Sequence, residues 1–188
     1  FFVRIPLQYF CIDLLWPTLL LLGVESVRIA PGVTPGVPLV FEHYPVSHSL
    51  LAVAAWALLL ALAYGFLRQD RRGAWIVGLA VLSHWLLDAV VHQPDLPLYP
   101  GSAVLAGLTL WDSLPATLAV ELPLFAAGVW LYLRATRPRD RIGTWGLGAL
   151  VGLLLAIYAG NLAGPPPPNV TAIAWAGQLQ WLLVLWAY

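Results

Sequence analysis

The sequence is poor in charged residues and lacks some residue types altogether. Only 10% of its 188 residues are charged, it has no Met and one Cys, and its nine basic residues are all Arg. A formal net charge of zero excludes the basic surface that nucleic-acid binding requires. Cys11 has no second cysteine with which to form a disulfide. Because the sequence begins at Phe1 without Met, we expect that it does not start at a native initiator.

Apolar residues take the place of the missing charge. They make up 61% of the chain, whereas a soluble domain is about half apolar and about a quarter charged. The composition predicts an all-α, polytopic membrane helix bundle. A span of ~30 Å of hydrocarbon takes about 20 helical residues, and about six segments reach that length. These segments are residues 7–24, 46–67, 74–91, 114–133, 145–162 and 170–188.

Segments rich in Pro and Gly separate these predicted helices. Residues 25–44 contain several of them and predict an ordered, turn-rich loop. Residues 165–168 are four consecutive prolines, which predict a stiff spacer before the last helix. We find no internal repeat and no second domain in the sequence. A single transmembrane domain over residues 1–188 is therefore expected.

The arginines predict the orientation of the chain. Two short loops on the same predicted side hold most of them: Arg68, Arg71 and Arg72 in one, and Arg134, Arg137, Arg139 and Arg141 in the other. Such loops are usually cytoplasmic. We therefore expect a bacterial inner-membrane protein with both ends of this chain in the cytoplasm. The ten Trp and seven Tyr are typical of side chains that anchor a protein to membrane lipids at the interface.

Ionisable residues interrupt the predicted helices. His84, Asp88 and His92 recur every fourth residue, so they share one face of a helix. His48 lies at the start of the preceding helix, and Asp13 and Glu121 lie within two others. All six fall in the outer half of the predicted membrane. Because ionisable side chains are costly in lipid, we expect them to converge on a protein-lined polar site.

Imidazoles and carboxylates together are typical ligands of a divalent metal ion, such as Zn²⁺ or Mn²⁺. The predicted ligands are His48, His84, Asp88 and His92. Glu121 and Asp13 are predicted to be catalytic, either by moving protons or by orienting the ligands. A bound metal ion would lower the pKa of water and so supply a nucleophile.

Each of these residues also has a purely structural interpretation. His48 could hydrogen-bond a loop carbonyl, and His84 and Asp88 could form a buried ion pair between helices. His92 lies near the expected interface, where a hydrated histidine is ordinary. Glu121 and Asp13 could form salt bridges or be protonated in the core.

Two short motifs resemble a known family. Ser47-His48-Ser49-Leu50-Leu51 opens one predicted helix, and Ser83-His84, followed by Asp88, lies near the end of the next. This pattern, over about the first half of the chain, resembles inner-membrane metal-dependent hydrolases, a family that includes a LexA-regulated bacterial protein. The resemblance implies hydrolysis at a divalent-metal site formed by His48, His84 and Asp88, with Asp13 as the acid of the first helix. Relatives usually carry an N-terminal His, and this sequence has none before His43.

Three functions are compatible with these patterns. The first is a metal-dependent hydrolase that acts on a lipid-linked or periplasmic substrate. The second is a non-catalytic accessory subunit of a larger membrane complex, such as an energy-transducing or photosynthetic one, with other membrane subunits as partners. The third is a small transporter or proton-relay protein, because intramembrane acids and histidines also form proton paths.

Overall fold

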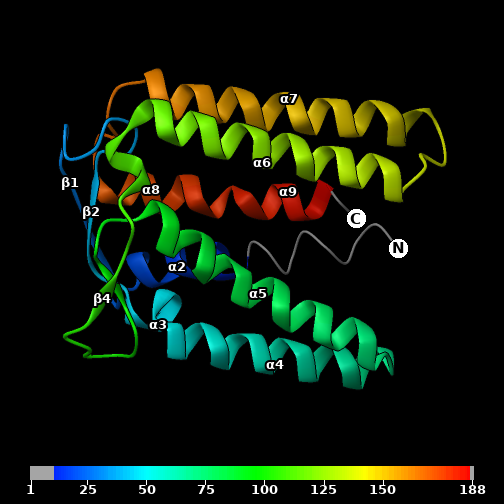
Figure 1. Ribbon diagram of the computed structural model, residues 1–188, viewed down its shortest axis with the longest axis horizontal. Helices are drawn as coiled ribbons and strands as arrows, with labels where there is room; N and C mark the ends of the chain where they lie inside the picture. The colour runs from blue at the N-terminus through cyan, green and yellow to red at the C-terminus, as the bar shows by residue number, and fades with distance from the viewer. Residues whose placement is uncertain (1–10, 187–188) are drawn as a thin grey trace. The chain divides into compact units, whose positions relative to one another are not determined.

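Helices dominate the computed structural model, which describes residues 11–186 (Figure 1). The chain divides into two compact units. The first contains the residues up to 30, residues 39–109 and those from 167 onward. The second contains residues 31–38 and 110–166. That both units form one transmembrane domain stays a prediction.

Four helices are long and apolar enough to cross a membrane, as the sequence predicts. Each starts after a polar residue whose side chain accepts a hydrogen bond from a backbone N–H of the first turn. Large apolar side chains such as Leu58, Leu62 and Trp75 are exposed, as contact with lipid requires. The four helices are α4 (Leu50–Arg68), α5 (Arg71–Val91), α6 (Leu114–Ala135) and α7 (Arg141–Ala163).

Within the described residues, the helices of the first and last predicted spans are short, and residues 7–10 and 187–188 of those spans lie outside the described part of the chain. Helix α2 (Cys11–Leu21) has 11 residues and contains Pro17, whereas α8 (Val170–Gln178) and α9 (Gln180–Trp186) have 9 and 7. At about 1.5 Å per residue, none of the three alone crosses ~30 Å of hydrocarbon. The expected count of six transmembrane helices is therefore not confirmed within residues 11–186.

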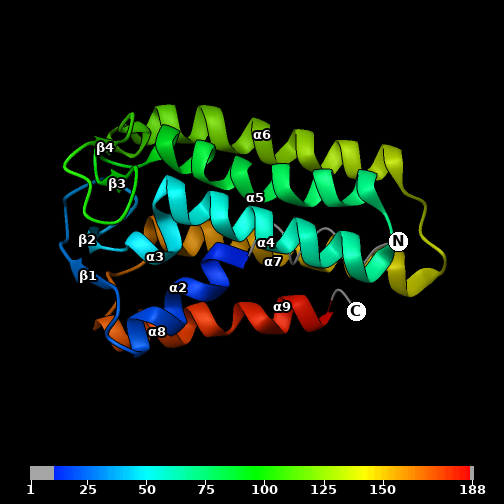
Figure 2. The same cartoon turned by 90° about the horizontal axis from the view of Figure 1, so that it is seen from below.

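Helices α2 and α8 pack against each other, as Figure 2 shows. The amide of Gln178 donates a hydrogen bond to Thr18 Oγ1. Gly177 faces Pro17 so closely that a Cβ at position 177 would lie 2.4 Å from the proline ring. This contact places the first turns of α2 beside the core of the first unit.

The expectation of an all-α fold missed two small antiparallel sheets. Strand β1 (Ser26–Ile29) pairs with β2 (Leu39–His43), and β3 (Leu96–Pro97) pairs with β4 (Leu105–Ala106). The first pair lies in the segment predicted to be only a turn-rich loop. Its strands carry Val, Ile and Phe, residues that favour the pleated conformation, and its turn holds the Pro and Gly residues.

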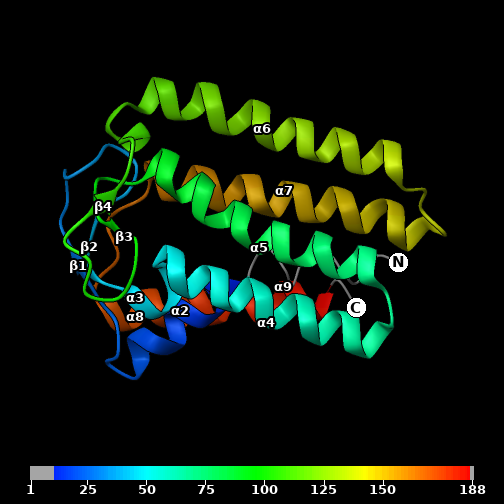
Figure 3. The same cartoon turned by 60° about the horizontal axis from the view of Figure 1, so that its bottom comes forward.

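Helices α4 and α5 form a tight antiparallel pair, visible side by side in Figures 1 and 3. Small residues allow the close approach, because a Cβ on Gly78 would lie 3.3 Å from the Cβ of Ala61. Val53, Val81 and Trp85 are buried between this pair and neighbouring segments of the first unit. The packing fixes the end of α5 beside the short helix α3 (Pro45–His48), which directly precedes α4.

In the second unit, a 3-10 turn, η1 (Leu110–Asp112), leads into α6. A short loop over residues 136–140 connects α6 to α7, and the Tyr158 hydroxyl of α7 donates a hydrogen bond to Glu121 of α6.

Candidate metal centre

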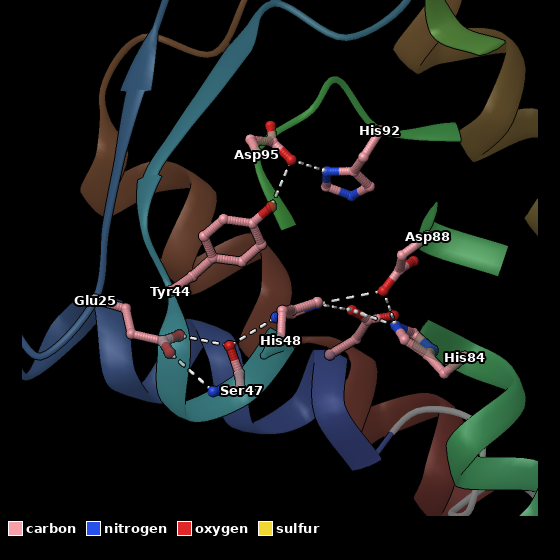
Figure 4. Close-up of polar contacts among 9 residues, drawn as sticks. Glu25, Tyr44, Ser47, His48, His84, Asp88, His92 and Asp95 are labelled. Carbon is pink, nitrogen blue, oxygen red and sulfur yellow. Dashed lines mark hydrogen bonds and ion pairs between the residues drawn. The ribbon is translucent and has the colours of Figure 1, made fainter. Parts of the chain in front are cut away.

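Three elements of the first unit bring four of the predicted site residues together. Asp13 lies in the first turn of α2, His48 is the last residue of α3, and His84 and Asp88 lie one turn apart on α5. Figure 4 shows the side chains of His48, His84 and Asp88 pointing toward one another. The i, i+4 spacing thus places His84 and Asp88 on the face of α5 that meets α3.

The closest potential ligand set consists of Asp13, His48 and His84, with one ligand atom from each residue within 4.8 Å of the others. Asp13 Oδ1 lies 3.7 Å from His48 Nε2 and 3.6 Å from His84 Nε2. Asp88 Oδ2 lies 3.2 Å from His84 Nε2 and 3.9 Å from His48 Nε2. This His/Asp set could hold a metal ion.

The distances suit metal ligands better than hydrogen-bonded ion pairs. A charged N–H···O bond between imidazole and carboxylate is about 2.7–2.9 Å long, whereas three of these four separations are 3.6 Å or more. In a tetrahedral site with bonds of about 2.0–2.1 Å, neighbouring ligand atoms lie about 3.3–3.4 Å apart. Asp88 Oδ2 is buried and accepts no hydrogen bond from any residue that the structure describes. A cation among these atoms would satisfy that oxygen.

A chain of hydrogen bonds orients the imidazole of His48. The Ser47 hydroxyl donates its proton to Glu25 Oε2 over 2.6 Å, and Ser47 Oγ lies 2.6 Å from His48 Nδ1 (Figure 4). Because the hydroxyl has only one proton, Ser47 must accept the second hydrogen bond from His48 Nδ1–H. In the neutral imidazole, Nε2 then carries the lone pair and faces Asp13, Asp88 and His84. A metal-binding histidine is commonly oriented in this way by a partner on its other nitrogen.

The carboxylate of Glu25 also caps the helix that carries His48. Glu25 Oε1 accepts hydrogen bonds from the backbone N–H groups of Val46 and Ser47, each 2.8 Å long. Helix α3 has no capping bond from its own N-cap residue, Tyr44, so Glu25 supplies it from the end of the α2–β1 connection. A negative charge at a helix N-terminus is favourable. Only 3% of Glu25 is exposed, so its three hydrogen bonds replace the water that it lacks.

Aromatic rings enclose the same imidazole. Tyr44 lies with its ring centroid 5.3 Å from that of His48, and Trp16 meets His48 edge-on at 6.5 Å. His48 is 6% exposed and Ser47 is fully buried. The site is therefore rigid and largely dry on this side.

His92 does not lie on the helix face that its spacing from His84 and Asp88 predicts. Helix α5 ends at Val91, and His92 has an extended backbone with φ −67° and ψ 156°. Its Nδ1 lies 3.1 Å from Asp95 Oδ1, and the same oxygen accepts a 2.6 Å hydrogen bond from the Tyr44 hydroxyl. His92 is thus not part of the closest ligand set in residues 11–186, and its role as a ligand stays a prediction.

Tyr44 remains a hydrogen-bond donor in this second cluster. Burial raises the pKa of its phenol far above the ordinary value, and the carboxylate of Asp95 raises that pKa further. The ring of Tyr44 lies between His48 and His92, with its centroid 6.1 Å from that of His92. Tyr44 therefore links the two polar clusters of the first unit by packing.

Glu121, the other predicted catalytic residue, belongs to the second unit. Its Oε1 accepts a hydrogen bond from Trp111 Nε1 at 3.2 Å, and its Oε2 accepts one from the Tyr158 hydroxyl at 2.8 Å. Both partners belong to the same unit. A catalytic role for Glu121 stays a prediction.

Sequence reasoning missed Glu25 and Asp95. Both lie between predicted helices, Glu25 in the segment 25–44 that is predicted to be a turn-rich loop, and charged residues in such segments are usually exposed. The one local signal near Glu25 is the alternation over Ser26–Ile29, which favours a strand but does not show that Glu25 reaches Ser47. Asp95 follows His92 by three residues, a spacing at which side chains can meet after a helix end.

Comparisons of the chain with protein-family models, curated proteins and solved structures found no match. The resemblance to the inner-membrane hydrolases therefore remains an expectation.

Proposed function

We propose that this protein is an integral membrane, metal-dependent hydrolase. One observation carries the proposal: imidazole nitrogens and carboxylate oxygens from α2, α3 and α5 face one another at 3.2–3.9 Å. At these separations one cation could bind atoms of Asp13, His48 and His84 together, with the buried Asp88 Oδ2 beside them. The four long apolar helices suggest a membrane protein.

In this proposal, Asp13, His48 and His84 hold the ion, and Glu25 acts through Ser47 to keep His48 Nε2 directed at it. A divalent ion at such a site lowers the pKa of a bound water to about 7. Asp88 Oδ2 accepts no hydrogen bond from a described residue, so it would be the group that takes up a proton from water at the ion. The aromatic rings beside His48 exclude bulk water.

The chemistry of the ligands favours Zn²⁺ or Mn²⁺. Imidazole suits Zn²⁺, and a mixed set with carboxylates also suits Mn²⁺. Two carboxylates beside two neutral imidazoles carry two negative charges, which a divalent cation neutralises in an apolar setting.

The proposed substrate is an ester, amide or phosphoester presented at the outer leaflet of a bacterial inner membrane. The turn between α4 and α5 carries Arg68, Arg71 and Arg72, and such turns are usually cytoplasmic. Asp88 lies 17 residues after Arg71, so about 25 Å of helix separates it from that turn. The site therefore lies close to the opposite membrane surface.

Elemental analysis of the purified protein tests the proposal. We expect about one Zn or Mn per chain in the wild type, and its loss in His84→Ala. His43→Ala is the matched control, because His43 is exposed at the end of β2 and should leave the metal content unchanged. Purified protein should also cleave at least one member of a panel of fluorogenic esters, amides and phosphodiesters, and a chelator should stop it.

A chain that takes up no Zn²⁺ or Mn²⁺, even when these ions are supplied, would contradict the proposal. The polar cluster would then be an ion-pair network, as a proton-relay protein requires. Metal that stays bound in both His84→Ala and His48→Ala would also contradict it, because the ion would then lie elsewhere.

A further inference from the structure

The second unit contains a pocket of its own, and none of the residues that line it belongs to the candidate metal centre. Its volume is about 190 Å³, and residues of α6, α7, η1 and the 31–38 segment line it. The polar and aromatic side chains of its wall are Trp111, Thr117, Glu121, Tyr158 and Asn161. Ligand pockets commonly measure about 300–1,000 Å³, so this one suits a small group rather than a large molecule.

Glu121 is the only acidic residue in this wall. Its two oxygens each accept one hydrogen bond, from Trp111 Nε1 and from the Tyr158 hydroxyl. Both partners are neutral, so they fix the carboxylate without cancelling its charge. Each oxygen of a carboxylate has a second lone pair, which a ligand can use.

Among the described residues, no basic side chain pairs with Glu121. The arginine of α6, Arg134, is 13 residues further along the same helix, or about 20 Å away. The remaining arginines of the unit, Arg137, Arg139 and Arg141, follow α6 in the loop to α7 or at its start. An acidic side chain within an apolar helix usually marks a site for an ion or a substrate.

The rest of the wall suits an organic cation. The rings of Trp111 and Tyr158 line the pocket, and such rings attract a cation at their faces. The side chain of Asn161 forms no hydrogen bond with the described residues and can accept one from a ligand N–H. One carboxylate, two aromatic rings and one amide are the groups that recognise an ammonium group.

We propose that this pocket binds an alkylammonium group, with Glu121 as its counter-ion. The group would come either from a small free amine or from the headgroup of an amine-bearing lipid. Glu121 is seven residues from the start of α6, about 10 Å along the helix, which a headgroup could reach from the membrane surface. The inference does not depend on the metal centre.

Two binding measurements on the purified, full chain distinguish the two sources. In detergent, isothermal titration with ethanolamine measures binding of a free amine, with ethylene glycol as the neutral probe of similar size. In nanodiscs, native mass spectrometry compares retention of phosphatidylethanolamine with retention of phosphatidylglycerol. We expect the ammonium compound to be preferred at least about tenfold in one of these measurements, a difference that one charged contact can supply.

Glu121→Gln keeps the shape of the side chain and should abolish this preference. Glu42→Gln is the control, because Glu42 is an exposed carboxylate paired with Arg28 on the β1–β2 sheet. Circular dichroism and thermal unfolding of Glu121→Gln report whether the variant is folded. The proposal is overturned if neither ammonium probe binds, if the neutral probes bind equally well, or if folded Glu121→Gln retains the preference.

Discussion

The polar cluster of the first unit and Glu121 of the second unit differ in the partners that their ionisable groups have in apolar surroundings. Glu121 receives a hydrogen bond at each oxygen from a neutral donor, Trp111 or Tyr158. In the cluster of Asp13, His48, His84 and Asp88, imidazole nitrogens and carboxylate oxygens face one another, and Asp88 Oδ2 accepts no hydrogen bond from a described residue. Neutral donors hold the Glu121 carboxylate in place and leave its charge uncancelled. Under the proposed function, the facing atoms of the cluster instead share a cation.

The residues around the two sites differ in the same way. The cluster has a second layer of support, because Glu25 and Ser47 fix His48 while Tyr44 and Trp16 pack against its ring. Glu121 instead borders an open pocket. Rigid support suits a site that must hold ligand atoms in fixed positions, and an open wall suits exchange of a ligand. Removing the groups of each site in turn tests this difference.

The largest effect is expected from His48→Ala, which removes one ligand and the end of the Glu25–Ser47 chain. In the wild type, Zn²⁺ at 100 times its Kd should raise the free energy of unfolding by about 2.7 kcal/mol. Thermal unfolding in detergent, with and without Zn²⁺, should show this gain in the wild type and in His43→Ala but not in His48→Ala. An equal gain in His48→Ala would mean that Zn²⁺ binds elsewhere and that His48 is not a ligand.

Asp88→Asn separates proton transfer from metal binding. Asparagine keeps the shape of the side chain but cannot take up the proton, so hydrolysis should fall about 100- to 10,000-fold while the metal content stays near one ion. Kinetics with the best substrate of the panel, together with elemental analysis of the same sample, measure both. Loss of the ion instead would make Asp88 a ligand, as the sequence predicts.

Glu25→Gln tests the second layer of the cluster. The carboxylate of Glu25 accepts three hydrogen bonds, from the backbone N–H groups of Val46 and Ser47 and from the Ser47 hydroxyl. The amide of glutamine would place an N–H group opposite at least one of these donors. The hydrogen bonds that orient His48 would then be lost. Changes of this kind typically weaken metal affinity about 10- to 100-fold. Competition with a fluorescent zinc chelator measures the affinity. Glu42→Gln is the control, because Glu42 is an exposed carboxylate, and its zinc affinity should match that of the wild type. An unchanged affinity would show that Glu25 only caps α3.

The sequence predicts those parts of this arrangement that local patterns determine. Long apolar runs with arginines at one end predict α4 to α7, and the i, i+4 spacing predicts the contact between His84 and Asp88. The position of His48 at a helix entry predicts its approach to them. The helices and the His84–Asp88 contact depend on residues within a few turns of one another, and His48 approaches them because a short turn joins two antiparallel helices.

Features that depend on contacts between distant segments were not predictable. Glu25 reaches Ser47 across 22 residues through the pairing of β1 with β2, which no local signal fixes. His92 continues the helical spacing of His84 and Asp88, yet α5 stops one residue earlier, so the pattern cannot show that its side chain turns to Asp95. Pocket formation around Glu121 likewise needs Tyr158, 37 residues away.

The smallest effect is expected from Tyr158→Phe, which removes one of the two neutral donors to Glu121. Because the tyrosine is only half-buried at the edge of a pocket, water can replace part of the lost hydrogen bond, and the free energy of unfolding should fall by about 1 kcal/mol. Equilibrium unfolding in mixed detergent measures this change. Tyr99→Phe is the control, because Tyr99 is exposed and should change little. Zinc affinity should not change in Tyr158→Phe, because the metal ligands have their own supports. A loss of zinc affinity comparable to that of Glu25→Gln would mean that the two polar sites are coupled, and the contrast between them would then be wrong.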